Sequence, residues 1–209
     1  MLTPQELQTV YAYRNLFDAQ RTWSTMTWRG HASAKIPNDM WLYQEAIFEL
    51  KPSLIVEFGT NEGGSALFLA DVMDAMESLN GRILTIDILR RDNLPRHPRI
   101  SYFVGHSRHD PAIAKVKEEV VAAKGPVMFI EDSEHSATHI AAELEIYAPM
   151  VTPGSYFVVE DCGWPDQTMI VQDVIAAFLK ANPDFEVDDS KGRYLMTLSP
   201  GGWVKRRKS

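Results

Sequence analysis

Short apolar runs alternate with longer segments of helical periodicity along most of the chain. The run at 54–58 has the length of a buried parallel strand, because Pro52 and Gly59 bound it. Similar runs predict strands at 82–88, 100–104, 126–130 and 155–159. Apolar residues at helical spacing predict helices at 40–50, 64–78, 111–123, 137–148 and 167–181, with Asp39 as the N-cap of the first. This alternation predicts an α/β fold with a doubly wound, Rossmann-like, mostly parallel sheet.

The last part of the chain predicts a different pairing. Strands are expected at 185–188 and 194–199, with a possible partner at 202–206, and the pair Gly201-Gly202 suits a hairpin. We therefore expect an antiparallel C-terminal edge on the sheet.

The first forty residues differ in character from the rest. A helix is predicted at 4–21, and the segment 23–39 has no periodicity but is rich in aromatic residues. It could be a lid, an oligomer arm or a surface wrap held by its tryptophans. The predicted division is an N-terminal helix with an aromatic arm or lid at 1–40, and a cofactor-binding domain at 41–209.

Composition narrows the function classes. The net charge of −7 over 209 residues gives no reason to expect a nucleic-acid partner. No stretch is long enough to span a membrane, and the single Cys162 excludes an internal disulfide. We expect a cytoplasmic protein, and the aromatic arm predicts a homo-oligomer.

A glycine-rich turn follows the first buried strand. Glu57 precedes Gly59 and Thr60, and Gly63 comes before Ser65 in the next helix. Glycines let the backbone turn sharply and let a ligand approach, while the helix start offers free N–H groups. The turn lacks the G-x-G-x-x-G pattern of NAD enzymes, and its acidic residues favour a positively charged cofactor, S-adenosylmethionine.

Two further positions belong to this predicted cofactor site. Asp87 ends the second strand, from which a carboxylate can accept hydrogen bonds from ribose hydroxyls. Ser107 follows the third strand and is expected to border the adenine. Each could instead serve only the local turn.

Three acids lie at the carboxyl ends of the fourth and fifth buried strands. Asp132 follows one strand, and Glu160 and Asp161 follow the other, so the three should converge beside the cofactor. Such acids repel one another unless a cation lies between them, and oxygen ligands favour Mg²⁺, then Mn²⁺. Neighbouring strand residues point to opposite faces, so Glu160 and Asp161 can both bind the ion only if the strand has already ended. His135 lies three residues after Asp132, near enough to act as a general base.

Several motifs together resemble one enzyme family. IVEFGTNEGGSA, EDSEHS and YFVVED resemble the cephalosporin-hydroxylase-like, CmcI-type family of class I S-adenosylmethionine-dependent O-methyltransferases, which is related to macrolide-sugar O-methyltransferases. WRGHASAKIPNDMWLYQE and TLSPGGWVKR are similar to that family too, so the resemblance runs from about residue 28 onward. It implies a Mg²⁺-dependent O-methyltransferase with His135 as the base. It also implies metal ligands at Asp132, Glu160 and Asp161, and cofactor contacts from Glu57, Gly59, Thr60, Gly63, Ser65, Asp87, Ser107 and Asp132.

The expected reaction is methyl transfer to a hydroxyl of a small molecule. The resemblance implies a sugar or a secondary metabolite as the acceptor. A catechol-like diol is the alternative acceptor, and a cofactor-binding protein without methyl transfer is the alternative from another class.

Overall fold

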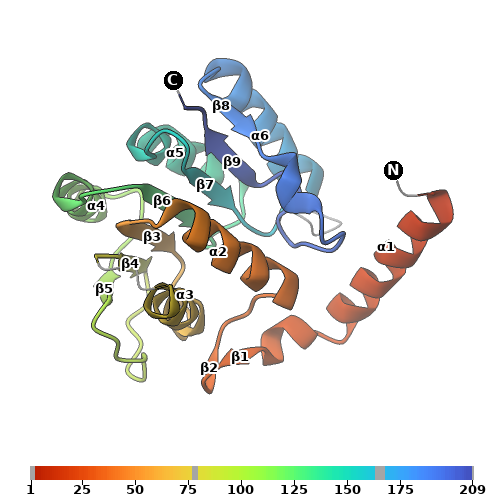
Figure 1. Ribbon diagram of the computed structural model, residues 1–209, viewed down its shortest axis with the longest axis horizontal. Helices are drawn as coiled ribbons and strands as arrows, with labels where there is room; N and C mark the ends of the chain where they lie inside the picture. Colours follow the sequence, from red (N-terminus) through yellow and green to blue (C-terminus); the bar gives the residue numbers. More distant parts are fainter. Residues whose placement is uncertain (1–2, 77–79, 163–167, 209) are drawn as a thin grey trace.

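The computed structural model describes residues 3–76, 80–162 and 168–208. The expected end of one helix at 77–78 and the expected start of another at 167 lie outside these residues. In the described part, the helices and strands follow the alternation expected from the sequence (Figure 1).

One mixed sheet forms the centre of the molecule. Its strands lie in the order β5-β4-β3-β6-β7-β9-β8, and β9 is antiparallel to both of its neighbours. The strands are β3 (Leu54–Phe58), β4 (Arg82–Asp87), β5 (Ile100–Val104), β6 (Val127–Glu131), β7 (Tyr156–Val159), β8 (Phe185–Val187) and β9 (Trp203–Arg206). The expected Rossmann-like sheet with antiparallel pairing near its C-terminal edge is confirmed.

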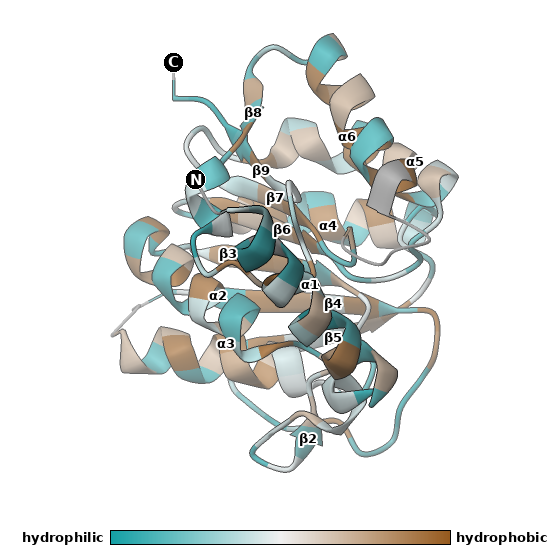
Figure 2. Ribbon diagram, turned by 90° about the vertical axis from the view of Figure 1, so that its right-hand side faces the viewer, coloured by the Kyte–Doolittle hydropathy of each residue, from teal (hydrophilic) through white to brown (hydrophobic). Residues whose placement is uncertain are grey.

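Helices cover both faces of this sheet because its central strands are apolar on both sides. Every residue of β3 and of β6 is buried, and Figure 2 shows hydrophobic residues along the central strands. One core contains residues of α2 (Pro37–Leu50) and α3 (Gly64–Ala75). The core on the other face contains residues of α4 (Asp110–Ala122), α5 (Ala137–Tyr147) and α6 (Thr168–Ala181). Short 3₁₀ turns lie at Ala148–Met150 (η2) and Asp189–Gly192 (η3).

The N-terminal segment is a helix followed by a small hairpin. Helix α1 (Pro4–Ala19) begins with a capping box between Thr3 and Glu6 and projects away from the sheet (Figure 1). The turn η1 (Thr22–Thr25) leads into β1 (Thr27–Trp28), which pairs with β2 (His31–Ala32). The hairpin is attached to α3 through Trp28, whose indole N–H donates to Asp71 over 2.8 Å. Among the described residues, no helix has both the length and the apolar character to cross a membrane.

The expected N-cap of α2 is wrong. The helix begins at Pro37 after an N-cap at Ile36, so Asp39 lies inside the first turn. Proline favours this early start, because its fixed φ suits the first helical position. The carboxylate of Asp39 is buried and accepts a hydrogen bond from the backbone N–H of Leu198 over 2.9 Å. Asp39 therefore connects α2 to the C-terminal segment.

The expected strand at 194–199 is also wrong, and so is its hairpin. The chain turns at Leu195, which has a left-handed φ of 66°. Met196 and Leu198 instead pack with Ile36 in a small separate core. The antiparallel partners of β9 are β8, the strand before it in the chain, and β7, which precedes α6.

Gly59 lies where the turn after β3 passes closest to the end of β6. Its φ is +94°, and a Cβ there would be only 1.8 Å from the carbonyl oxygen of Asp132. Gly201 also has a positive φ, +73°, but has open space around its Cα. Substitutions at these two glycines therefore separate the free-energy cost of a left-handed backbone from the cost of a steric clash.

We expect Gly59→Ala to destabilise the protein by about 3 kcal/mol or more, because strain and a backbone clash add. Gly201→Ala should cost about 1 kcal/mol, from the left-handed backbone alone. Urea unfolding of both variants measures the difference. Equal losses would mean that the chain relaxes around the new Cβ and that this close approach does not constrain the turn.

Candidate functional site

A cavity of about 740 Å³ opens at the carboxyl ends of β3, β4 and β6. This is the crevice where parallel α/β sheets bind ligands. Eight of the predicted site residues line it: Gly59, Thr60, Ser65, Asp87, Ser107, Asp132, His135 and Asp161. The other three, Glu57, Gly63 and Glu160, are not among the described residues that form its wall.

Asp87 holds the glycine turn. One of its carboxylate oxygens accepts hydrogen bonds from the backbone N–H groups of Thr60 and Asn61, over 3.1 and 3.0 Å. The other accepts from the N–H of Leu89 over 2.8 Å, so the acid also caps the loop that follows it. Each carboxylate oxygen can accept more than one hydrogen bond, so Asp87 still has acceptor capacity toward the cavity.

Glu57 lies in β3, just before the glycine turn, and holds the residues around that turn through hydrogen bonds. Its carboxylate is buried within β3 and accepts hydrogen bonds from the hydroxyls of Ser65 and Thr85. Burial raises the pKa of Glu57 to about 7. Glu57 therefore fixes the start of α3 at Ser65, while Gly63, with φ of +75°, occupies the N-cap position of that helix.

A lysine ammonium lies between two of the three predicted metal-binding acids. Nζ of Lys35 is 2.8 Å from Asp132 and 2.7 Å from both carboxylate oxygens of Glu160. The hydroxyl of Tyr43 also donates to Glu160. Burial alone would lower the pKa of Lys35, but Asp132 and Glu160 raise it well above its usual value. The cation that the sequence required near these acids is thus supplied, in part, by the chain itself.

Asp161, the third predicted metal-binding acid, faces His135 and not Lys35. Strand β7 ends at Val159, and the chain takes a left-handed φ of 55° at Asp161. Glu160 consequently turns toward Lys35, while Asp161 faces His135, with 3.1 Å between Oδ2 and Nε2. One donor atom each from Asp132, His135 and Asp161 lies within 4.8 Å of the others. Asp132, His135 and Asp161 therefore form the acid and imidazole cluster at the cavity wall.

Burial and charge act together on this cluster. Burial raises the pKa of Asp132, and the nearby Lys35 opposes that shift. Burial also raises the pKa of Glu160, and Lys35 again opposes the shift. Both carboxyl groups therefore depend on positive charge close by to remain ionised.

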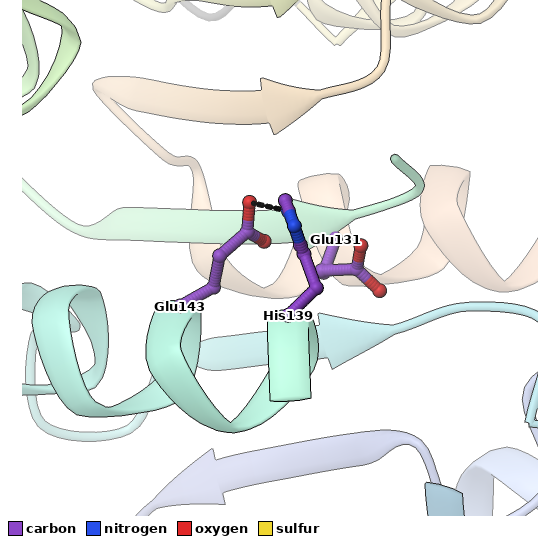
Figure 3. Close-up of side chains that lie close together, drawn as sticks. All are labelled: Glu131, His139 and Glu143. Carbon is purple, nitrogen blue, oxygen red and sulfur yellow. Dashed lines mark hydrogen bonds and ion pairs between the residues drawn. The ribbon is translucent and has the colours of Figure 1, made fainter. Parts of the chain in front are cut away.

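A second cluster lies on the opposite side of β6. Glu131, His139 and Glu143 are buried, and the imidazole is drawn between the two carboxyl groups in Figure 3. Burial raises the pKa of Glu131 well above its usual value. Two signals in the sequence mark this group: an acid directly before Asp132, and a histidine and a glutamate four residues apart in a predicted helix.

The N-terminal segment contributes to the cavity. Asp18, Trp23, Ser33 and Ala34 line it, and the next residue is Lys35. The sequence showed an aromatic segment here but gave no signal for the role of Lys35, because its partners lie 97 and 125 residues away. Whether the segment is a lid or an oligomer contact stays a prediction.

Comparison with known proteins gives a consistent result. A family profile described as Rhamnosyl O-methyltransferase/CmcI matches residues 20–207. A rhamnosyl O-methyltransferase of Mycobacterium leprae is 34% identical over 93% of this chain and 89% of that protein. A rhamnosyl O-methyltransferase of Mycobacterium tuberculosis is 37% identical, and the match spans 71% of this chain and 62% of that protein. The resemblance seen in the motifs is confirmed.

Solved structures of CmcI share the fold. An apo structure has a TM-score of 0.72, and a structure with Mg and SAM has a TM-score of 0.68. Each is 23% identical and covers 89% of this chain and 78% of the CmcI chain.

Lys35→Met should destabilise the protein by about 3–5 kcal/mol near neutral pH, because two buried carboxylates lose their counter-charge. Without the lysine, the folded-state pKa values of Asp132 and Glu160 rise further above their unfolded values. The loss of unfolding free energy should therefore shrink as the pH falls from neutral toward the unfolded-state pKa values of about 4, because both acids take up protons in the folded state first. Urea unfolding across this pH range measures it.

Lys191→Met is the matched control. Lys191 is also buried, but its acidic partner Glu49, 3.2 Å away, is exposed. Its replacement leaves no buried acid unpaired and should cost about 1 kcal/mol, with little dependence on pH. Equal losses in the two variants would contradict the role given to Lys35.

Proposed function

Because the chain belongs to the Rhamnosyl O-methyltransferase/CmcI family and is an S-adenosylmethionine-dependent O-methyltransferase, we propose that it methylates a sugar hydroxyl with the help of Mg²⁺. The observation that carries this proposal is the cluster of Asp132, His135 and Asp161 in the wall of the same cavity as the glycine turn. The sugar acceptor is supported by the rhamnosyl O-methyltransferase of Mycobacterium leprae, which matches nearly the whole chain.

The cofactor is proposed to lie along the ends of β3 and β4. Asp87 would accept hydrogen bonds from the ribose hydroxyls, and Ser107 would border the adenine. The backbone at Gly59 and Thr60 would approach the amino-acid part of the cofactor, next to Asp132 and above the Ser65 hydroxyl held by Glu57. A volume of about 740 Å³ is large enough for the cofactor and a small acceptor.

Asp132 and Asp161 are proposed as the metal ligands that face the cavity. Their carboxylate oxygens suit a hard divalent ion, Mg²⁺ first and Mn²⁺ second. Glu160 is the third predicted ligand, and its part depends on Lys35, which contacts both of its oxygens. A cation at this position would place positive charge beside the acceptor oxygen and lower the pKa of that hydroxyl.

His135 is proposed as the general base. If Nε2 carries its hydrogen toward Asp161, Nδ1 keeps a free lone pair, and this atom has no hydrogen-bond partner in the described part of the chain. A carboxylate that orients an imidazole in this way fixes its tautomer. His135 would take the hydroxyl proton as the acceptor oxygen attacks the sulfonium methyl group.

The acceptor is proposed to contact the N-terminal segment, because Asp18 and Trp23 line the same cavity as the glycine turn. Self-association through this segment stays a prediction, supported by the exposed Tyr11, Tyr13 and Leu16 of α1. A cytoplasmic location also stays a prediction.

The proposal is tested by incubating the protein with S-adenosylmethionine and a panel of an alkyl rhamnoside, other simple glycosides and catechol. We expect S-adenosylhomocysteine and a methyl ether on a glycoside, both identified by mass spectrometry and NMR. Turnover should fall at least about tenfold with EDTA and recover with Mg²⁺. Methylation of catechol alone would favour the diol acceptor, and full turnover in EDTA would remove the metal from the proposal.

His135→Ala should lower kcat by about 10²–10⁴-fold, because the acceptor hydroxyl loses its general base. Binding of S-adenosylhomocysteine, measured by calorimetry, should be unchanged. His109→Ala is the control, because His109 is exposed and does not appear in the cavity wall. Unchanged turnover and pH profile in His135→Ala would exclude His135 as the base.

A further inference from the structure

The cluster of Glu131, His139 and Glu143 is distinct from the cluster of Asp132, His135 and Asp161, although His139 reaches the wall of the same cavity. Glu131 is the last residue of β6, and its neighbour Asp132 faces Lys35 on the other side of the strand. His139 and Glu143 are one turn apart on α5, so both side chains project from one face of that helix. A donor atom of each of the three residues lies within 4.8 Å of the other two.

Polar atoms surround the imidazole on one side. His139 Nε2 is 2.8 Å from Oε1 of Glu143, 3.1 Å from the hydroxyl of Ser133 and 3.3 Å from that of Ser107. Oε1 of Glu131 accepts hydrogen bonds from the N–H and the hydroxyl of Ser133, over 3.1 and 2.9 Å. The ring nitrogen Nδ1 points toward Glu134, 3.3 Å away.

One carboxyl oxygen of Glu131 and one of Glu143 have no hydrogen-bond partner in the described part of the chain. Oε2 of Glu131 and Oε2 of Glu143 are buried and lack a hydrogen-bond partner among the described residues. Buried carboxylate oxygens are normally paired, and each orphan is costly.

Geometry leads to the same conclusion. Two carboxyl groups and one imidazole converge on one point, and a divalent cation there would be a partner for the oxygens that lack one. A mixed set of imidazole and carboxylate ligands favours Zn²⁺ or Mn²⁺ over Mg²⁺.

We propose that Glu131, His139 and Glu143 form a second divalent-metal site, of the Zn²⁺ or Mn²⁺ type. Its position indicates a structural role, because the ion would tie the end of β6 to α5. Ser107, Ser133 and His139 also line the large cavity, which provides a path for the ion. The proposal is independent of the acceptor and of the metal at Asp132 and Asp161.

Zinc stoichiometry tests it. Asp161→Asn removes one acid of the cavity cluster, so the remaining zinc reports on the second site. Protein loaded with Zn²⁺ and freed of excess metal by gel filtration is analysed by mass spectrometry of the element. We expect about one zinc per chain in Asp161→Asn and close to none in Asp161→Asn with Glu143→Gln.

Glu145→Gln in the same Asp161→Asn background is the matched control. Glu145 lies on the same helix but is exposed, so this variant should keep its zinc. Zinc should also raise the melting temperature of the control and leave that of the Glu143→Gln variant unchanged. Equal zinc content in the two variants would overturn the proposal.

A crystal of the Asp161→Asn protein soaked in Zn²⁺ provides a test that does not need the second substitution. An anomalous peak bounded by Glu131, His139 and Glu143 is the expected result. No peak there, or a peak only at other histidines, would overturn the proposal even if Glu143→Gln failed to fold.

Discussion

The buried ammonium of Lys35 is the interaction on which the arrangement of the cavity depends. It joins three parts of the chain that are distant in sequence: the N-terminal segment, the end of β6 at Asp132 and the end of β7 at Glu160. Buried charges are tolerated only when they are paired and hydrogen-bonded, and here each of the three groups satisfies the others. The position of the segment before α2 is therefore set by charge as well as by apolar packing.

The pairing of Lys35 with Asp132 and Glu160 also gives the acids at the carboxyl end of the sheet different surroundings. Lys35 and Tyr43 bind Glu160, which is not part of the described cavity wall, whereas Asp161, in a left-handed conformation, faces His135 within that wall. Glu131 and Asp132 also have different surroundings, since Asp132 contacts Lys35 and Glu131 accepts hydrogen bonds from Ser133. Four acids at two strand ends thus have separate surroundings, which is why two distinct clusters exist within a few residues.

Local pattern was enough to predict much of this protein. The strands from 54 to 159 and the glycine turn were predictable because their apolar runs, glycines and acids follow one another along the chain. Asp39 and the segment 194–199 were misassigned because their partners are remote: Asp39 binds the backbone of Leu198, and Met196 and Leu198 pack on Ile36. The sequence predicted a metal ion between these acids and not Lys35, since no local rule connects a lysine at 35 with acids at 132 and 160. Glu57 was expected to face the cofactor, yet hydroxyls of Ser65 and Thr85 hold it inside the sheet.

The place of Lys35 in the chain determines whether the N-terminal segment can be removed or exchanged independently of the central sheet. The aromatic arm, predicted as a unit that ends near residue 40, carries the charge that balances Asp132 and Glu160 at the ends of β6 and β7. A fragment starting at residue 41 would keep every strand of the central sheet but would bury Asp132 and Glu160 without that lysine. A chimera that carries the N-terminal segment of a relative should therefore fold stably only if that segment also places a positive charge beside Asp132 and Glu160.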